Sequence, residues 1–197
     1  ETGGKPLTGH VVDTILRQVG AIQQGHFLLT SGLHSNTYVE KFQVLQWPRQ
    51  TERLCSFIAA EFRDRGIEVV AGPTTGGIII AYEVARQLDV RGIFAERSDS
   101  GGRTFRRGFQ VRPGERVLVV DDILTTGGSI QDVVDEVRRL HGEVVAVAVL
   151  VDRSDGKARL DAPVFALHRL SIPTYQPQAC PLCAHGEPLT KPGIGST

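Results

Sequence analysis

Residues 117–129 read VLVVDDILTTGGS, and this one stretch places a strand, an acid pair, a loop and the start of a helix in succession. Residues 117–120 are continuously apolar, as in a strand that is buried on both faces. Asp121 and Asp122 follow directly, and after Ile123 and Leu124 come glycines and hydroxyl side chains. The stretch therefore predicts a polar site at the end of a buried strand. The helix beyond it is indicated by apolar residues at helical spacing: Ile130, Val133, Val134, Val137 and Leu140.

The same alternation of strand and helix patterns continues on both sides of this unit. Short apolar runs that predict strands cover residues 68–71, 91–96 and 144–151, and helix patterns cover residues 49–65 and the stretch after residue 77. Such alternation is typical of an α/β fold with a central parallel sheet flanked by helices. The two ends are less regular. There we expect a helix over residues 7–22, extended or looped chain over 25–44, a strand over 164–170 and an extended tail.

The loop after the acid pair has the composition of a phosphate cradle. In an open parallel sheet, ligands bind beyond the carboxyl ends of the strands, and a helix N-terminus offers unpaired N–H groups to an anion. Gly127 and Gly128 permit close approach of the backbone, while Thr125, Thr126 and Ser129 add hydroxyl donors. Carboxylates beside a phosphate suit sugar hydroxyls or a Mg²⁺ shell. The pattern indicates a phosphorylated ribose; the alternative is that the acids only cap the helix and the glycines only form a turn.

The composition disfavours several classes of protein. The 197 residues contain 22 basic and 22 acidic side chains, so no basic surplus exists to neutralise a nucleic-acid backbone, and we expect no nucleic-acid partner. The apolar runs are far shorter than the roughly 18 residues of a membrane span. Three cysteines are an odd number, which argues against a disulfide framework and for a reducing compartment. We therefore expect a cytoplasmic protein with no membrane partner and no targeting segment at its polar start.

Residues 117–129 closely resemble the 5-phosphoribosyl-1-pyrophosphate (PRPP) motif of type I phosphoribosyltransferases. Three further segments look like the orotate phosphoribosyltransferase family: residues 25–35 with Tyr38, the loop at 71–77, and residues 152–154. The resemblance extends over roughly residues 7–192. It implies that the chain transfers 5-phosphoribose from PRPP to orotate, giving orotidine 5′-monophosphate and pyrophosphate in pyrimidine (UMP) biosynthesis. That activity is a glycosyltransferase activity of the pentosyltransferase class.

The resemblance also implies an architecture and partners. We expect the type I phosphoribosyltransferase fold in a single domain over residues 1–197. Its parts would be an N-terminal helix and hood at about residues 1–45, a core at 46–160, and a C-terminal strand with an extended tail at 161–197. The expected small-molecule partners are PRPP and orotate, with Mg²⁺ as cofactor carried mainly by PRPP, and the expected assembly is a homodimer.

A role for each matching residue follows from the resemblance. Orotate would contact Thr125 and pair with Arg153 in a bidentate manner; the alternative for Arg153 is a surface ion pair with Asp152 or Asp155. The residues expected to act in catalysis are Asp121, Asp122, Arg97 and Arg103. The residues expected to bind PRPP are Asp121, Asp122, Ile123, Leu124, Thr125, Thr126, Gly127, Gly128, Ser129, Thr74, Thr75, Gly76 and Arg97.

The sequence departs from the family pattern in its cations. The segment 96–107, which matches a mobile loop in the family, is short and lacks the usual Lys and His. Its cations are Arg97, Arg103, Arg106 and Arg107. We expect residues 98–102 to flex as a lid with Arg103 as its cation, and Arg106 and Arg107 to form a solvated face.

Two lysines of the family pattern are also replaced. Gly76 and Thr30 stand where many relatives carry Lys. Lys41 is a candidate to compensate for the missing lysines, although it could equally be an ordinary surface lysine. Fewer lysine contacts would weaken PRPP binding without changing the reaction class.

The cysteines leave two possibilities open. Cys180 and Cys183 form a C-x-x-C pair followed by His185, which could bind Zn²⁺ or could instead be a turn or an oxidisable pair. A zinc site needs about four ligands, and the chain has no second C-x-x-C. Cys55 lies on an expected core helix, where packing is the simpler role.

Two alternative functions remain at this point. One is a phosphoribosyltransferase that acts on another base, which the segment 27–38 and Arg153 disfavour. The other is a non-catalytic PRPP-binding regulator that acts on nucleic acid, which the balanced charge disfavours.

Overall fold

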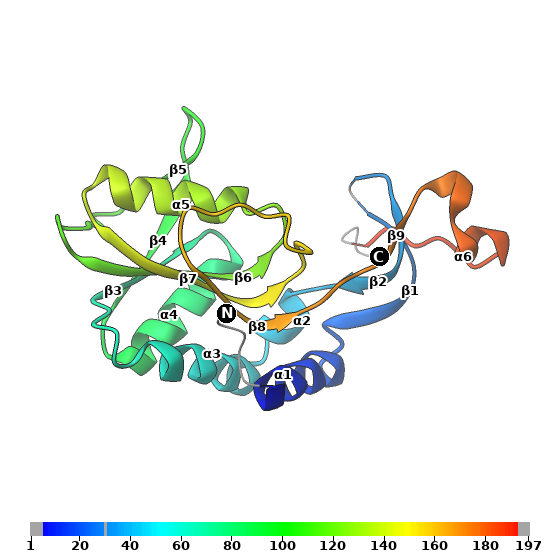
Figure 1. Cartoon of the computed structure of the whole chain (residues 1–197), viewed down its shortest axis with the longest axis horizontal. Helices are drawn as coiled ribbons and strands as arrows, with labels where there is room; N and C mark the ends of the chain where they lie inside the picture. Colours follow the sequence, from blue (N-terminus) through cyan, green and yellow to red (C-terminus); the bar gives the residue numbers. More distant parts are fainter. Residues whose placement is uncertain (1–5, 30, 193–197) are drawn as a thin grey trace.

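The computed structural model describes residues 6–29 and 31–192 and contains two β-sheets (Figure 1). The larger sheet has six strands in the order β5-β4-β3-β6-β7-β8, which run parallel except for β5 at one edge. The α/β class with a parallel-dominated sheet is confirmed. Its strands are β3 (Val69–Pro73), β4 (Arg91–Arg97), β5 (Arg103–Phe105), β6 (Arg116–Leu124), β7 (Glu143–Asp152) and β8 (Val164–Arg169).

Helices cover both faces of this sheet, with α5 on one side and α1, α3 and α4 on the other (Figure 1). The side chains of β6 alternate accordingly. Val117 and Val119 pack on the α5 side, whereas Leu118 and Val120 pack on the side of α3 and α4. The helices are α1 (Pro6–Gln18), α2 (Phe42–Leu45), α3 (Pro48–Phe62), α4 (Gly76–Leu88), α5 (Gly128–Arg139) and α6 (Pro181–Ala184).

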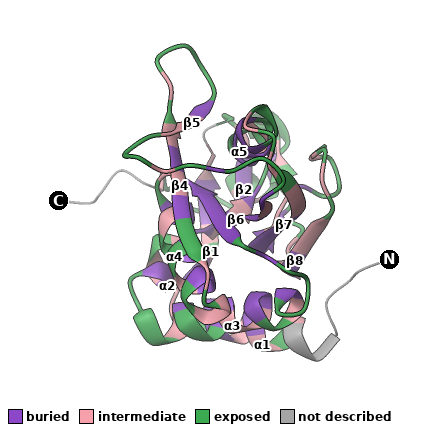
Figure 2. Cartoon of the chain, turned by 90° about the vertical axis from the view of Figure 1, so that its left-hand side faces the viewer, coloured by how far each residue is buried: buried purple, intermediate pink, exposed green. Residues whose placement is uncertain are grey.

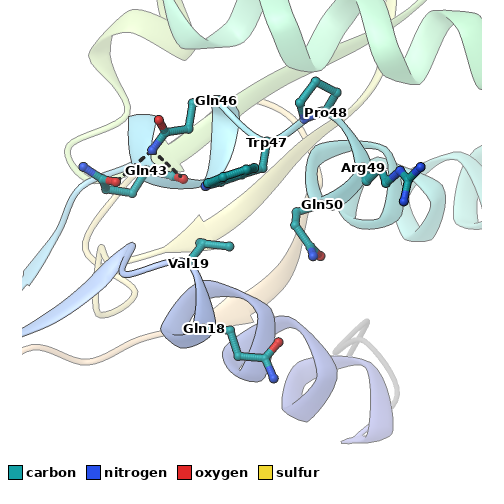
Figure 3. A pocket seen from close by; sticks show the side chains of 8 residues that line it. All are labelled: Gln18, Val19, Gln43, Gln46, Trp47, Pro48, Arg49 and Gln50. Carbon is teal, nitrogen blue, oxygen red and sulfur yellow. Dashed lines mark hydrogen bonds between the residues drawn. The ribbon is translucent and has the colours of Figure 1, made fainter.

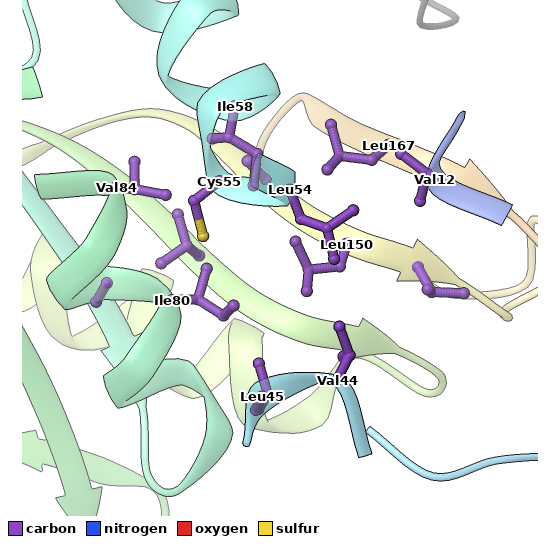
Figure 4. Packing of buried hydrophobic residues seen from close by; sticks show 14 of the residues in the cluster. Val12, Val44, Leu45, Leu54, Cys55, Ile58, Ile80, Val84, Leu150 and Leu167 are labelled. Atoms are coloured by element: carbon purple, nitrogen blue, oxygen red, sulfur yellow. The ribbon is translucent and has the colours of Figure 1, made fainter. Parts of the chain in front are cut away.

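Cys55 belongs to the larger of the two apolar clusters (Figure 4). It lies on α3 and is fully buried in the same cluster as Leu54, Ile80 and Val84. Burial strongly raises the pKa of the Cys55 thiol above its usual value. The sequence-based prediction that Cys55 is a core residue is confirmed, and its thiol is chemically inert there.

The hood is a small antiparallel sheet, drawn apart from the core in Figure 1. Its strands are β1 (Ile22–Leu28), β2 (His34–Val39) and β9 (Thr174–Tyr175), in the order β1-β2-β9. The tail is more ordered than the expected extended chain. Beyond β9 it forms a 3₁₀ turn and the short helix α6, and the Thr190 N–H then donates a 2.8 Å hydrogen bond to the His26 carbonyl on β1. The N-terminal and C-terminal segments therefore build the hood together.

The ends of several elements differ from the expectations. The strand predicted at residues 117–120 continues to Leu124, so that Asp121 and Asp122 lie within β6 and not after it. The continuation is explained by β7, which pairs with β6 as far as Leu124.

Membrane insertion is not indicated by the helices. None of those in the described parts of the chain is long and apolar enough to cross a membrane.

Candidate active site

The acid pair lies at the carboxyl end of β6, next to the loop that follows β3. Both side chains are buried, with Asp121 at 8% and Asp122 at 1% relative exposure. Neighbouring residues of a strand point to opposite sides, and the contacts of the two acids differ accordingly. Lys41 Nζ donates a 3.2 Å hydrogen bond to Asp122 Oδ1 and lies 3.1 Å from Oδ2, although not in hydrogen-bonding direction to the latter. Lys41 is thus a neighbour of the acid pair and not an ordinary surface lysine.

Glycines let the loop at residues 72–77 pack directly on the acids. A Cβ on Gly76 would lie 1.6 Å from Asp122 Oδ2, and one on Gly77 would lie 3.1 Å from Asp121 Oδ1. The loop itself is closed by backbone contact, because a Cβ on Gly72 would lie 2.3 Å from the Gly77 carbonyl oxygen. Gly76 therefore leaves the Asp122 carboxylate the space that a side chain at position 76 would occupy.

Burial disfavours the charged form of both acids. It is the main reason that the pKa values of Asp121 and Asp122 lie above the usual range of carboxyl groups. The charge of Asp122 raises the pKa of Asp121 further, whereas the charge of Lys41 opposes the rise at both carboxyl groups. Anions held in this way interact strongly with any cationic group that enters the site.

The loop after β6 presents backbone N–H groups at the start of α5. Gly127 has a φ of 88°, in the left-handed region, and its carbonyl accepts the N–H groups of Ile130 at 3.1 Å and Gln131 at 2.8 Å. Gly128 and Ser129 come before Ile130 and Gln131 in the chain. Their N–H groups lie in the first turn of the helix, where donors lack intrahelical partners. A Cβ on Gly128 would meet no atom within 4 Å. The loop therefore has space on the side where an anion would approach.

Arg103 connects the two loops. Its guanidinium donates to Thr74 Oγ1 at 2.8 Å and to Ser129 Oγ at 3.3 Å, and the residue is only 8% exposed. Burial, and then the charge of Arg97, hold the pKa of Arg103 below its usual value. Arg103 thus lies on β5, facing the site, and not in the expected lid loop.

The turn from β4 to β5 is a short hairpin, whose tip is exposed (Figure 2). It is closed by hydrogen bonds between the backbones of Ser98 and Gly102 at 3.1 Å and Ser98 and Gly101 at 3.1 Å. Arg97 is exposed at the end of β4. Arg106 and Arg107 are exposed and pair with Asp99 and Glu96, as expected for a solvated surface, although they follow β5 and do not belong to a strand.

Arg153 approaches the same edge of the sheet from β7. Its N–H donates to the Leu124 carbonyl at 2.8 Å, which places it beside the end of β6. The expected alternative of an ion pair with Asp152 or Asp155 is not seen: among the described residues no ion pair includes Arg153, and Asp152 lies 3.8 Å from Arg169. The Nε atom of Arg153 is buried and has no partner in the part of the chain that is described.

Tyr38 contributes to the surroundings of Arg153 from strand β2 of the hood. Burial raises the pKa of the Tyr38 hydroxyl, Glu40 adds to the rise, and the charge of Arg153 opposes it. Burial also holds the pKa of Arg153 below its usual value. A half-buried guanidinium that forms no ion pair among the described residues, next to an aromatic hydroxyl, is suited to an anionic ligand.

The large open cavity in Figure 3 is separate from the site around Asp121 and Asp122. It has a volume of about 790 Å³ and lies where the end of α1 faces α2 and the start of α3, and no residue of the two site loops lines it. Thr30, which stands in place of a family lysine, lies outside the described residues. Cys180 and Cys183 lie in the hood and not beside the acids. The lining residues of the cavity are Gln18, Val19, Gln43, Gln46, Trp47, Pro48, Arg49 and Gln50.

The comparisons with known proteins agree with this geometry. Residues 43–176 match the phosphoribosyl transferase domain. A protein named orotate phosphoribosyltransferase from Desulforamulus reducens is 51% identical over 91% of this chain and 93% of its own length. One of the same name from Pelotomaculum thermopropionicum is 50% identical over 95% of this chain and 98% of its own. The chain belongs to the orotate phosphoribosyltransferase family.

Solved structures show the same fold in this family. The orotate phosphoribosyltransferase of Aeropyrum pernix has a TM-score of 0.66 at 26% identity and covers 81% of this chain and 93% of its own. That of Mycobacterium tuberculosis H37Rv, solved with Fe(III) dicitrate, has a TM-score of 0.68 at 24% identity over 84% of this chain and 97% of its own. The type I phosphoribosyltransferase fold and the family resemblance inferred from residues 117–129 are confirmed.

The sequence missed two features of the site. The first is the bridge that Arg103 makes between Thr74 and Ser129, because nothing in the pattern of residues 96–107 distinguishes an inward strand from a flexible loop. The second is the contact of Lys41 with Asp122, which are 81 residues apart. A signal for it was available: Gly76 removes a family lysine, and a lysine elsewhere was a candidate to replace it.

Proposed function

We propose that this chain transfers 5-phosphoribose from PRPP to orotate and releases pyrophosphate. The observation that carries the proposal is the position of Arg103, which links Thr74 in the loop after β3 to Ser129 in the first turn of α5, beside the buried acid pair. PRPP carries a phosphate at one end and a pyrophosphate at the other. Each end would contact one of the two segments that Arg103 links. The sequence identity to curated relatives supports orotate over another base as the acceptor.

The two loops would divide the phosphates of PRPP. The 5′-phosphate fits at the start of α5, where Gly128 leaves open space and Thr125, Thr126 and Ser129 are exposed. The pyrophosphate fits the loop that contains Thr74, with Arg103 and the exposed Arg97 as cations. Binding there would hold the donor in one orientation for in-line displacement.

The acid pair would act on the ribose. As the bond from the anomeric carbon to pyrophosphate breaks, positive charge develops on the ribose, and buried carboxylates stabilise it without needing to reorganise. Asp121 and Asp122 also accept hydrogen bonds from ribose hydroxyls. Orotate reacts as the anion that remains after its acidic ring N–H has lost a proton to solvent. That nitrogen bonds to the anomeric carbon from the opposite face, and the electron pair of the broken carbon–oxygen bond leaves with pyrophosphate.

A Mg²⁺ ion fits the same place. Magnesium prefers oxygen ligands, and the site offers two buried carboxylates, of which Asp122 Oδ2 makes no hydrogen bond within the described residues. When bound with PRPP, the ion would supply charge neutralisation for the departing pyrophosphate. The protein itself holds Asp121 and Asp122 at the end of β6, and the positive charge of Lys41 partly neutralises the negative charge of Asp122.

Orotate would bind between β7 and the hood. Its carboxylate would pair with the guanidinium of Arg153, whose buried Nε atom has no partner among the described residues. Tyr38 lies near this cation, and Thr125 is exposed at the adjoining loop. The arrangement favours an anionic base, because a neutral base would leave the half-buried guanidinium of Arg153 unpaired.

The assay that tests the function follows the loss of orotate absorbance in the presence of PRPP and Mg²⁺. We expect turnover with orotate and none with adenine, hypoxanthine, guanine or uracil. Turnover of a purine alone would show that the acceptor is a purine and not orotate. PRPP binding without turnover of any base would favour the alternative function of a non-catalytic PRPP-binding regulator.

The variant Arg153→Lys tests the orotate site. We expect it to lower kcat/KM for orotate by roughly tenfold to a hundredfold, since a charge-assisted bidentate bond contributes about 1.5–3 kcal/mol. The KM for PRPP should stay unchanged. Arg159→Lys is the matched control, because Arg159 is exposed and forms no ion pair among the described residues. Equal orotate kinetics in both variants would contradict the assigned role.

A further inference from the structure

Four side chains with metal-binding atoms meet in the hood, outside the site described above. They are His26 on β1, His34 on β2, and Cys180 and Cys183 at the start of α6. Their ligand atoms all lie within 4.8 Å of one another. His26, His34 and Cys180 are buried, while Cys183 is exposed. Two imidazoles and two thiols make a complete set of four ligands from one chain.

The separations of these atoms match those around a tetrahedral zinc ion. With bonds of about 2.3 Å to sulfur and about 2.0–2.1 Å to nitrogen, a tetrahedron places sulfur and nitrogen ligands about 3.5 Å apart. Cys180 Sγ and Cys183 Sγ lie 3.5 and 3.7 Å from His26 Nε2, and Cys183 Sγ lies 3.3 Å from His34 Nδ1. The two imidazole nitrogens are 2.9 Å apart, slightly closer than the roughly 3.3 Å of a tetrahedral edge.

A backbone contact fixes the orientation of one ligand. The Nδ1 atom of His26 lies 2.8 Å from the carbonyl oxygen of Glu187, to which an Nδ1–H group donates. That bond gives Nε2 of His26 a lone pair, and Nε2 faces the other three ligand atoms, which it contacts through hydrogen bonds in this structure. A histidine ligand whose second nitrogen donates to a carbonyl is the usual arrangement at protein zinc sites.

The fold explains why residues so distant in sequence meet. Strand β9 pairs with β2 in the register His34 to Tyr175, which brings the tail to the hairpin. The tail then turns through α6 and returns to β1, where Thr190 bonds to the backbone of His26. His185, which the sequence suggested as a ligand, lies after α6 and is not part of the cluster.

We propose that His26, His34, Cys180 and Cys183 bind a structural Zn²⁺ ion that fastens the C-terminal tail to the N-terminal hairpin. Sulfur and imidazole ligands in a tetrahedron favour zinc over magnesium or calcium, which prefer oxygen. Four protein ligands leave no open position for a substrate, so the site is structural and not catalytic. The small sheet also needs such support, since β9 has two residues and offers little apolar area.

The metal content of the purified full chain tests the proposal. The protein is produced without a histidine tag in zinc-supplemented medium, and zinc is measured by mass spectrometry. We expect about one zinc per chain in the wild type and less than about a tenth of that in Cys183→Ser. Because Cys183 is exposed, this variant removes a ligand without opening the core. Cys55→Ala and His185→Ala are matched controls and should keep the wild-type content.

Spectroscopy and stability separate the proposed role from incidental binding. Cobalt in place of zinc should give the absorption of a tetrahedral centre with thiolate charge transfer, and Cys183→Ser should lose both. Removing zinc with a chelator should lower Tm by several degrees, since metal bound only to the folded state stabilises it. A zinc-free wild type, or full zinc in Cys183→Ser, would overturn the site, and an unchanged Tm after zinc removal would overturn its structural role. None of these readouts depends on phosphoribosyl transfer.

Discussion

Asp121 shows how a single residue can serve the reaction at the expense of stability. Its carboxylate is buried beside Asp122, and burial together with that neighbouring charge raises its pKa. The folded protein therefore holds a proton more tightly than the unfolded chain does. As pH rises from the ordinary carboxyl range of about 3.9 through the raised pKa, the folded state loses stability. The cation that enters with PRPP would reverse this cost.

The variant Asp121→Asn should separate the two effects. The amide oxygen can still accept the 2.9 Å hydrogen bond from the Asp122 N–H, while the charge is gone. We expect the ligand-free variant to be more stable than the wild type by about 1 kcal/mol at high pH. Its free energy of unfolding should also decrease less steeply than that of the wild type as pH rises. Its kcat should fall by about 10²–10³-fold. Denaturation across pH and the orotate assay measure the two quantities.

The control for this variant is Asp64→Asn, because Asp64 is exposed after the end of α3. It should change neither stability nor turnover. Near-normal turnover of Asp121→Asn would remove the assigned role of the acid pair.

At the scale of the element, the start of α5 combines a fold requirement and a binding requirement in adjacent glycines. Gly127 is left-handed, and a Cβ there would lie 3.0 Å from Leu160 Cδ2. Gly128 has ordinary backbone geometry and open space beside it. The backbone conformation requires a glycine only at position 127, whereas the open space beside Gly128 would admit the phosphate that we propose binds there.

Alanine at each position should therefore give opposite results. Gly127→Ala should lower the free energy of unfolding by about 1–2 kcal/mol, because a side chain is strained at positive φ. Gly128→Ala should keep or slightly raise stability, since alanine favours a helix, but should weaken PRPP binding. Denaturation and calorimetric titration with PRPP test the pair, each variant being the control for the other. Equal PRPP affinity in Gly128→Ala and the wild type would place the 5′-phosphate elsewhere.

The elements also show what a sequence can and cannot predict. The unit from Val117 to Arg139 was predicted nearly in full, because buried strands and amphipathic helices carry periodic apolar patterns. Only the end of β6 was wrong, since the pairing of Leu124 with Asp152 on β7 outweighs the polar character of the acids. The hood was not predicted in detail. Its strand β2 is largely polar, and β9 exists only because the tail returns to it.

The same limit applied to the sites. Local motifs indicated the phosphate loop and the acid pair, because their chemistry lies within a few consecutive residues. The partners of Cys180 and Cys183 could not be recognised, since His26 and His34 are about 150 residues away and resemble ordinary strand residues. Long-range contacts of this kind depend on topology and not on local pattern.

At the scale of the whole molecule, four exposed large apolar side chains lie on or beside helices α2 and α4, and α2 contacts α4. We refer to these four residues together as the α2–α4 surface: Phe42, Trp47, Ile79 and Tyr82. Tyr82 is 69% and Trp47 55% exposed, which is unusual for residues of this size in a monomer. The cavity of Figure 3 borders Trp47 and adds a hollow beside it. We therefore expect the α2–α4 surface to be the place where two copies meet in the homodimer that the family resemblance implies.

A charge in the middle of the α2–α4 surface should dissociate such a dimer. We expect Tyr82→Glu to be a monomer at micromolar concentration in light scattering after size exclusion, while the wild type is a dimer, because dimerisation would bury an unpaired carboxylate. Leu189→Glu is the matched control, since Leu189 is a large exposed apolar residue in the tail. A monomeric wild type, or a dimer that Leu189→Glu disrupts as strongly as Tyr82→Glu does, would mean that this surface is not where two copies meet.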